Sequence, residues 1–210
     1  MKRKKKKMST TYYVFINGIC TIPGDVSAWT DMAETWVETH CMRSHATRLE
    51  YAADPIFRRM HQNARVDDLE TIVRRLAGHQ IILVGHSNGC DIIERFIKRK
   101  NYVIDEIHLI AAASEADFQK NGINNALKIG FIKRVHVYWS AKDGALKKAK
   151  WSSTLLSWIG LGYGYLGLVG PKKVDPLVQS RVDNTERSFD HSEWFNESRF
   201  NETMRSITGK

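Results

Sequence analysis

The chain has 210 residues, which is enough for one three-layer α/β core and short for two domains. A composition of 42% hydrophobic and 10% aromatic residues excludes a largely disordered chain. The net charge is +9, but the run Lys2–Lys7 supplies six of these charges, so the remainder carries an ordinary +3. We therefore expect a basic, disordered tail over residues 1–10 and a single domain over residues 11–210.

Cysteine usage and targeting signals favour a cytoplasmic protein. Cys20, Cys41 and Cys90 form no C-x-x-C pair, which favours reduced thiols. The basic start followed by the apolar run Tyr12–Ile16 has the look of a signal peptide, but cleavage near Cys20 would remove the first core strand. The longest apolar stretch, Leu155–Val169, is too short to span a bilayer and is interrupted by glycines.

Strand and helix patterns alternate along the chain, which is typical of a parallel sheet covered on both faces by helices. The fold class predicted is a three-layer α/β sandwich with a mostly parallel central sheet. In chain order the predicted elements are strand Tyr12–Ile16, helix Ser27–His40, strand Thr47–Tyr51, helix Asn63–Ala77, strand Ile81–Val84 with the helix after it, strand Ile107–Ala111, a brief helix Ile123–Leu127, strand Val135–Trp139, a weak strand near Val182, and a closing helix from Trp194 onwards.

The segment Gly85–Gly89 reads Gly-His-Ser-Asn-Gly, which is the nucleophile-elbow pattern G-x-S-x-G. Four aliphatic residues precede it as a buried strand, and an amphipathic helix follows. Small residues let the chain turn sharply between these elements and leave the Ser87 hydroxyl at the strand tip. The pattern therefore favours a functional serine over a purely structural turn.

This order of elements, with the elbow at Ser87, resembles the α/β-hydrolase fold. The chain looks like a small member that lacks the first two strands and any large cap, and the resemblance covers nearly everything after the lysine run. The family places nucleophile, acid and histidine in that chain order, each in a loop after a particular strand. The resemblance therefore implies an acid and a histidine further along the chain.

Asp143 is the acid that the resemblance favours. It follows the strand Val135–Trp139 in a turn beside Gly144. An aspartate beside glycine is also a routine turn residue. Glu115 and Asp117, which follow the preceding strand, therefore remain alternatives.

His191 matches the family's histidine. It lies in a loop after the last weak strand, C-terminal to the acid candidate. His79, His86 and His108 lie in or beside strands, where structural roles are more common. The order of the candidates thus indicates a Ser-His-Asp triad.

The resemblance implies a role for each group. His191 would accept the Ser87 proton as the serine attacks a carbonyl, and Asp143 would orient the imidazole. The oxyanion would be held by the backbone N–H groups of Asn88 and Ile19, with Gly18 allowing close backbone approach.

The substrate is less clearly specified. The glycine-rich segment from Leu155 to Pro171, with Trp158 and Leu161, is either a flap lining an acyl pocket or a loop packed on the core. We expect substrate contacts at these two residues and at His86. The function predicted is ester cleavage by a serine hydrolase through an acyl-enzyme intermediate, with a small acyl ester as substrate. The residues do not distinguish lipid, short ester, thioester or amide.

Two other classes of function remain open. One is a catalytically idle binding module on the same fold. The other is weak contact with nucleic acid or an anionic surface through Lys2–Lys7, although one basic run without aromatic residues does not predict specific nucleic-acid binding. Codons for this run could also spell a ribosome-binding sequence, with translation starting at Met8. No metal-ligand spacing, phosphate loop or dinucleotide fingerprint is present, so neither cofactor nor metal is expected.

Overall fold

The computed structural model describes residues 10–18, 28–49, 51, 62–148 and 164–210. The basic run and Met8 lie outside these ranges. Six strands form one sheet in the order β2-β1-β3-β4-β5-β6, and every neighbouring pair is parallel. The strands are β1 (Thr11–Ile16), β2 (Ser44–Leu49), β3 (Gln80–His86), β4 (Ile104–Ile110), β5 (Ile132–Trp139) and β6 (Val182–Glu186).

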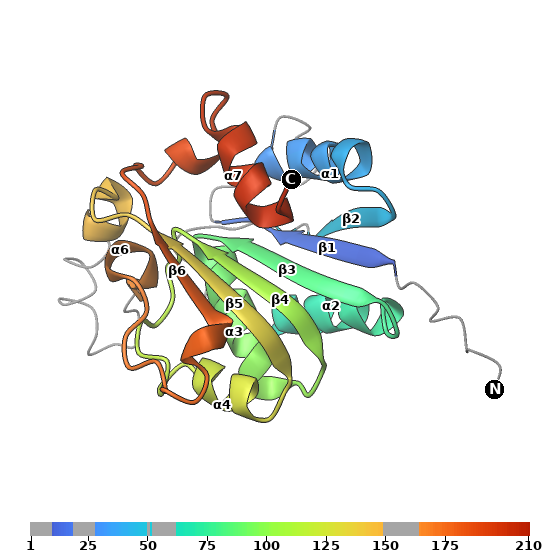
Figure 1. Cartoon of the computed structure of the whole chain (residues 1–210), viewed down its shortest axis with the longest axis horizontal. Helices are drawn as coiled ribbons and strands as arrows, with labels where there is room; N and C mark the ends of the chain where they lie inside the picture. Colours follow the sequence, from blue (N-terminus) through green and yellow to red (C-terminus); the bar gives the residue numbers. More distant parts are fainter. Residues whose placement is uncertain (1–9, 19–27, 50, 52–61, 149–163) are drawn as a thin grey trace.

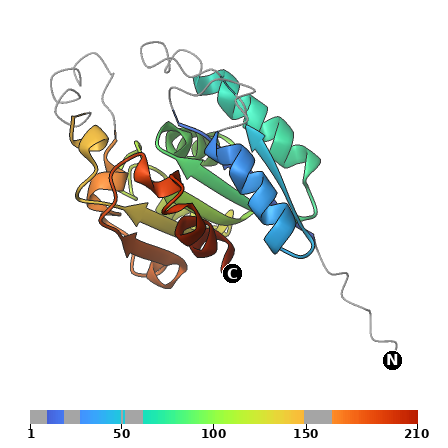
Figure 2. The ribbon, with the colours of Figure 1, turned by 90° about the horizontal axis from the view of Figure 1, so that it is seen from above.

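Helices cover both faces of the sheet (Figures 1 and 2). One face carries α1 (Trp29–His40) and α7 (Phe200–Thr208), and the other carries α2 (Gln62–Arg75), α3 (Asn88–Arg99) and α4 (Ile123–Lys128). Shorter elements include α6 (Leu166–Val169) and the 3₁₀ turns η2 (Gln179–Arg181) and η3 (Glu193–Phe195). The predicted three-layer α/β fold is confirmed.

Most predicted elements differ from those observed by a few residues at their ends, and two differences are larger. The second strand ends at Leu49 rather than Tyr51, and it begins at Ser44, in register with Thr11. The predicted closing helix is divided, because a turn separates η3 from α7. Asn196 makes this turn, since its Oδ1 accepts a hydrogen bond from the Arg199 N–H at 3.1 Å and its carbonyl oxygen accepts one from the Phe200 N–H at 2.8 Å.

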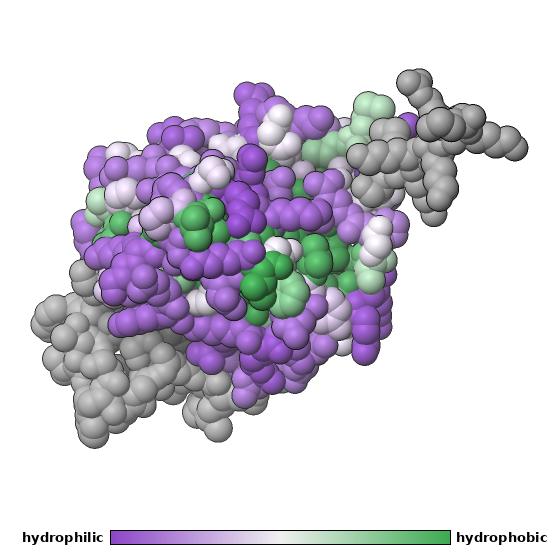
Figure 3. Space-filling model, turned by 60° about the horizontal axis from the view of Figure 1, so that its bottom comes forward, coloured by the Kyte–Doolittle hydropathy of each residue, from purple (hydrophilic) through white to green (hydrophobic). Residues whose placement is uncertain are grey.

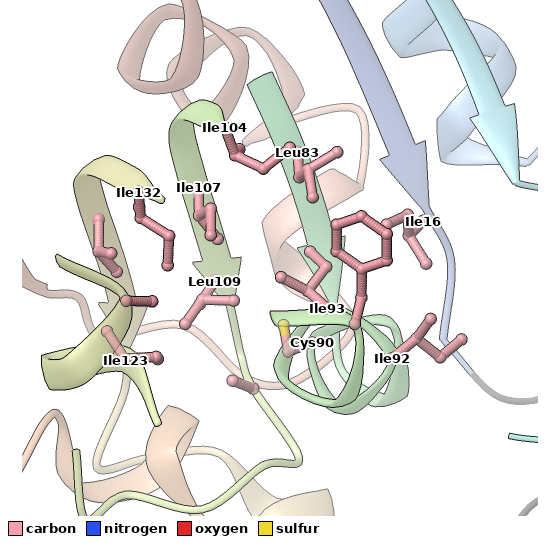
Figure 4. Packing of buried hydrophobic residues seen from close by; sticks show 14 of the residues in the cluster. Ile16, Leu83, Cys90, Ile92, Ile93, Ile104, Ile107, Leu109, Ile123 and Ile132 are labelled. Atoms are coloured by element: carbon pink, nitrogen blue, oxygen red, sulfur yellow. The ribbon is translucent and has the colours of Figure 1, made fainter. Parts of the chain in front are cut away.

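Strand side chains alternate between two hydrophobic cores. On one face, Leu83 and Ile107 pack against Ile92 and Ile93 of α3, and Figure 4 shows these side chains interdigitating between the helix and the strands. On the other face, the side chain of Val84 belongs to the cluster beneath α1 and α7. The elbow strand β3 is therefore buried on both sides, as a central parallel strand requires.

None of the helices in the described ranges is long and apolar enough to cross a bilayer. The face shown in Figure 3 is largely hydrophilic, with hydrophobic side chains gathered near its middle. Cys41 and Cys90 are buried, free thiols.

Candidate active site

Ser87 lies at a sharp turn between β3 and α3. Its backbone has φ +53° and ψ −117°, a conformation that costs energy for any residue with a side chain. Two main-chain hydrogen bonds to the end of β4 and the residues just after it hold Ser87 in this conformation. The Ser87 N–H donates to the Ile110 carbonyl at 2.9 Å, and the Ser87 carbonyl accepts from the Ala113 N–H at 3.1 Å. The nucleophile candidate is thus fixed by main-chain bonds to the adjacent strand end.

Close contacts with backbone atoms explain why the motif has glycine at positions 85 and 89. A Cβ on Gly89 would lie 2.3 Å from the carbonyl oxygen of Ile16, and one on Gly85 would lie 3.0 Å from the Cys90 nitrogen. Both neighbours are backbone atoms, which cannot rotate away. Glycine at these two positions therefore lets α3 cross close over the ends of β1 and β3.

The structure brings Ser87, His191 and Asp143 together. The His191 ring lies with Nε2 2.9 Å from Ser87 Oγ and Nδ1 2.7 Å from Asp143 Oδ2. Asp143 is fully buried, and its second oxygen accepts the Leu146 N–H at 2.8 Å. Because Nδ1 faces a carboxylate it carries the ring proton, which leaves Nε2 to accept the Ser87 hydroxyl hydrogen.

Asp190 joins the two loops that carry the histidine and the acid. Its Oδ1 accepts hydrogen bonds from the backbone N–H groups of Gly144 and His191, each at 2.8 Å. These two bonds hold the pKa of the Asp190 carboxyl below its usual value, so it stays charged. Asp190 was not predicted from the sequence; its one signal there is a carboxylate immediately before His191.

His86 lies beside His191 at the end of β3. Its Nε2 is 3.2 Å from the His191 carbonyl oxygen, and its ring has edge contacts with Trp29 and Phe195. Burial lowers the pKa of His86 to about 3, so the neutral ring donates to that carbonyl. In this structure His86 therefore supports the histidine loop; its predicted contact with substrate stays a prediction.

The loop after β1 approaches the serine directly. A Cβ on Gly18 would lie 3.0 Å from Ser87 Cβ and 3.5 Å from Ser87 Oγ. The Gly18 N–H donates to Asn17 Oδ1 at 2.8 Å, and the Trp29 Nε1–H donates to the same oxygen at 2.6 Å. Because Gly18 has no side chain, the loop can lie against Ser87, and the Asn17 side chain holds the conformation of the loop. Ile19 lies outside the described residues.

Asn88, the other predicted oxyanion residue, is the first residue of α3 and is fully buried. Its side-chain Oδ1 accepts a hydrogen bond from Gln62 Nε2 at 3.0 Å. The Tyr51 hydroxyl donates to the Asn17 carbonyl nearby. Neither Gln62 nor Tyr51 was singled out from the sequence, since these residues lie 26 and 34 positions along the chain from their partners Asn88 and Asn17.

The competing acids have other partners. Asp117 binds Lys173 Nζ at 2.7 Å, and this ammonium holds the pKa of Asp117 below its usual value. Glu115 accepts a hydrogen bond from the Asp117 N–H at 3.0 Å. Among these candidates, the side chain in contact with the His191 ring is Asp143.

The glycine-rich segment is described only in its last part. Trp158 and Leu161 lie outside the described residues. From Leu166 the chain packs on the core: the Ser140 N–H donates to the Gly167 carbonyl at 2.9 Å, and a Cβ on Gly167 would lie 2.2 Å from the Ala112 nitrogen. Residues 166–169 therefore form a packed turn against the ends of β4 and β5.

Comparison of the sequence with protein-family models and with curated proteins gives no match. Solved structures do match in shape. The mouse alpha/beta hydrolase domain-containing protein 10 aligns with a TM-score of 0.54 and 13% identity over 94% of this chain and 88% of its own. A predicted CIB-like hydrolase from Thermoplasma acidophilum aligns with a TM-score of 0.55 and 12% identity, over 97% and 89% of the two chains. Est1E from Butyrivibrio proteoclasticus aligns with a TM-score of 0.55 and 8% identity, over 98% and 88%. The resemblance inferred from the sequence is thereby confirmed as a likeness of fold.

Proposed function

We propose that this chain, whose fold is that of the α/β hydrolases, is a serine hydrolase that cleaves an ester through a Ser87-His191-Asp143 triad. The observation that carries the proposal is the continuous hydrogen-bond path from Ser87 Oγ to His191 Nε2 and from His191 Nδ1 to Asp143. An alcohol is a weak nucleophile at neutral pH, and this arrangement supplies the base that activates it.

The residues then act in two stages. As Ser87 Oγ attacks the ester carbonyl, its proton moves to His191 Nε2, and buried Asp143 stabilises the imidazolium that forms. The proton passes to the leaving alcohol, which departs and leaves an acyl-serine. In the second stage His191 takes a proton from water and the resulting hydroxide attacks the acyl carbon. The bond from that carbon to Ser87 Oγ then breaks, His191 returns its proton to the serine, and the carboxylic acid is released.

The negative oxygen formed in each stage requires donors fixed in advance. The backbone N–H of Asn88 is the proposed first donor, since it belongs to the first turn of α3, where the helix dipole favours negative charge. The Ile19 N–H is the proposed second donor, in the loop that Gly18 brings against Ser87.

The strained backbone at Ser87 favours catalysis over a catalytically idle binding module. Ser87 keeps a hydroxyl side chain at positive φ, where glycine would carry no strain, and that hydroxyl lies 2.9 Å from Nε2 of His191. Thioester and amide cleavage use the same triad and remain the alternatives to ester cleavage.

Activity-based labelling tests the proposal. A fluorophosphonate should label the purified full chain at Ser87, and p-nitrophenyl esters of increasing acyl length should be hydrolysed. Ser87→Ala should lose both reactions and keep its thermal midpoint. Ser192→Ala, beside the histidine on an exposed turn, is the matched control and should retain both. Labelling of Ser87→Ala at the parent rate would contradict the assignment.

A further inference from the structure

Two histidines and a glutamate form a polar cluster on the sheet face that α1 and α7 cover. Glu106 and His108 lie two residues apart on β4, so their side chains share one face, and His136 on β5 is in direct register with His108. On the same face of β3, Ile82 and Val84 belong to a hydrophobic core. The cluster thus places three ionisable side chains within an otherwise apolar layer. None of the three takes part in the proposed reaction at Ser87.

Hydrogen bonds fix which ring nitrogen of each histidine carries the proton. The Tyr138 hydroxyl donates to the Ser206 carbonyl at 3.1 Å, so it accepts from His108 Nδ1–H, 3.2 Å away. His136 Nδ1 lies 3.1 Å from Asp183 Oδ2 and donates to that carboxylate. Both rings are therefore held with a lone pair on Nε2. Metal-binding histidines use the same arrangement, in which the ring nitrogen that does not bind the metal donates its hydrogen to a neighbouring acceptor.

Three acceptor atoms consequently face one another. His108 Nε2 is 3.6 Å from Glu106 Oε2, and His136 Nε2 is 3.4 Å from the same oxygen. Neither Nε2 makes a hydrogen bond of ordinary geometry among the described residues, although His108 is only 1% exposed. Burying such groups without a partner is costly. A cation between them would remove that cost.

The spacing fits a small divalent ion. Ligand atoms bound tetrahedrally to Zn²⁺ at about 2.0–2.2 Å lie roughly 3.4 Å from one another. The two nitrogen–oxygen separations here are 3.4 and 3.6 Å, and all three ligand atoms lie within 4.8 Å of one another. The two imidazole rings are stacked, with centroids 4.3 Å apart and planes 6° from parallel. Shared coordination requires both rings to tilt so that their lone pairs converge.

We propose that Glu106, His108 and His136 form a binding site for a divalent transition-metal ion of the Zn²⁺ class, separate from the serine site. Two imidazoles and a carboxylate suit such metals, whereas Mg²⁺ and Ca²⁺ prefer oxygen ligands alone. The ion would tie β4 to β5, with Asp183 of β6 orienting one ligand.

The site has access to solvent. A cavity of about 420 Å³ reaches all three side chains, and its other walls include Cys41 and the C-terminal residues Thr208 to Lys210. Water from this cavity can complete the coordination sphere. Because the end of α7 lines the same cavity, bound metal should also stabilise the C-terminal helix against the sheet.

Zn²⁺ binding to the untagged full chain tests the proposal. Protein stripped with a chelator and dialysed against micromolar Zn²⁺ should retain one ion per chain, and Zn²⁺ should raise the thermal midpoint. Glu106→Gln and His136→Gln, at partly exposed positions, should each lower the affinity by more than about 100-fold. Asp183→Asn, which changes only the outer partner, should lower it by about 10- to 100-fold.

His79→Gln, at an exposed histidine before β3, is the matched control and should bind like the parent. A parent chain that retains no Zn²⁺ overturns the proposal, and so do ligand variants that bind as tightly as the parent. Co²⁺ gives a second test that needs no variant: strong visible absorption of the tetrahedral ion is expected, and only the weak bands of hydrated Co²⁺ would contradict the site. None of these measurements depends on the activity of Ser87.

Discussion

Asp190 Oδ1 accepts a hydrogen bond from the backbone N–H of Gly144 at 2.8 Å. Since the same oxygen also accepts the His191 N–H, one carboxylate sets the distance between the turn that holds the acid and the loop that holds the histidine. We expect Asp190→Ala to lower kcat by about 10- to 100-fold with little change in KM, because small misplacement of the base slows proton transfer.

Asp190→Asn provides the control, because an amide oxygen can still accept both bonds. It should recover most of the lost turnover. Steady-state kinetics on a p-nitrophenyl ester measures both variants. Parent-like kcat in Asp190→Ala would show that the two loops hold their positions without this residue.

The choice of acid can be tested by two matched amide variants. Asp143→Asn should reduce turnover by about 10⁴, as in the analogous serine-protease change, because the histidine loses the charge that orients it. Asp117→Asn should be mild, since Asp117 pairs with Lys173 instead. Reversal of this ranking in kcat would move the acid to the loop after β4.

His86 predicts a contribution to the pH dependence of stability. Burial lowers its pKa from 6.5 to about 3, so between these values the unfolded chain binds a proton that the folded chain does not. Stability should therefore fall as the pH drops from about 6.5 towards 3. His86→Gln keeps an N–H donor for the His191 carbonyl but cannot titrate, so its unfolding free energy should depend less steeply on pH over this window. Equal slopes in denaturant titrations of parent and variant would refute the shift.

The glycine after the elbow predicts a steric effect. Gly89→Ala places a Cβ 2.3 Å from the Ile16 carbonyl oxygen, and neither backbone can move freely. Overpacking of this kind typically costs about 1–3 kcal/mol. The thermal midpoint should fall clearly, while Gly144→Ala, whose Cβ would meet its nearest neighbour at 3.5 Å, should change it little. Equal midpoints for the two variants would show that α3 can shift away from β1.

Acyl-chain selectivity tests the glycine-rich segment. If Trp158 and Leu161 line an acyl pocket, Trp158→Ser and Leu161→Ser should raise KM more for long acyl esters than for acetate, because longer chains bury more apolar surface. Kinetics across a series of p-nitrophenyl esters measures this. An equal loss for all chain lengths together with a lower thermal midpoint would assign both residues to the core.

Local patterns predicted the elements and the elbow, because the apolar spacing of β3 and α3 and the small residues around Ser87 act over only a few positions. The choice between Asp143 and Asp117 was left open, since it depends on which loop reaches the histidine across the sheet. Asp190 was missed because its partners include the backbone of Gly144, 46 residues away. A related reason explains why the cluster of Glu106, His108 and His136 was not predicted. The register between β4 and β5 brings its members together, and their spacing along the chain is not one typical of metal ligands.

The main-chain bonds of Ser87 have a consequence for how this fold can diversify. Its N–H and its carbonyl are both hydrogen-bonded to the end of β4 and the residues just after it, so the sheet sets the position of the hydroxyl that we propose as the nucleophile. Loops elsewhere on that edge can be lengthened, shortened or exchanged without relocating it. If Ser87 is the nucleophile as proposed, substrate range can change through these loops while the serine stays in place, and loop grafting is the way to redesign this chain.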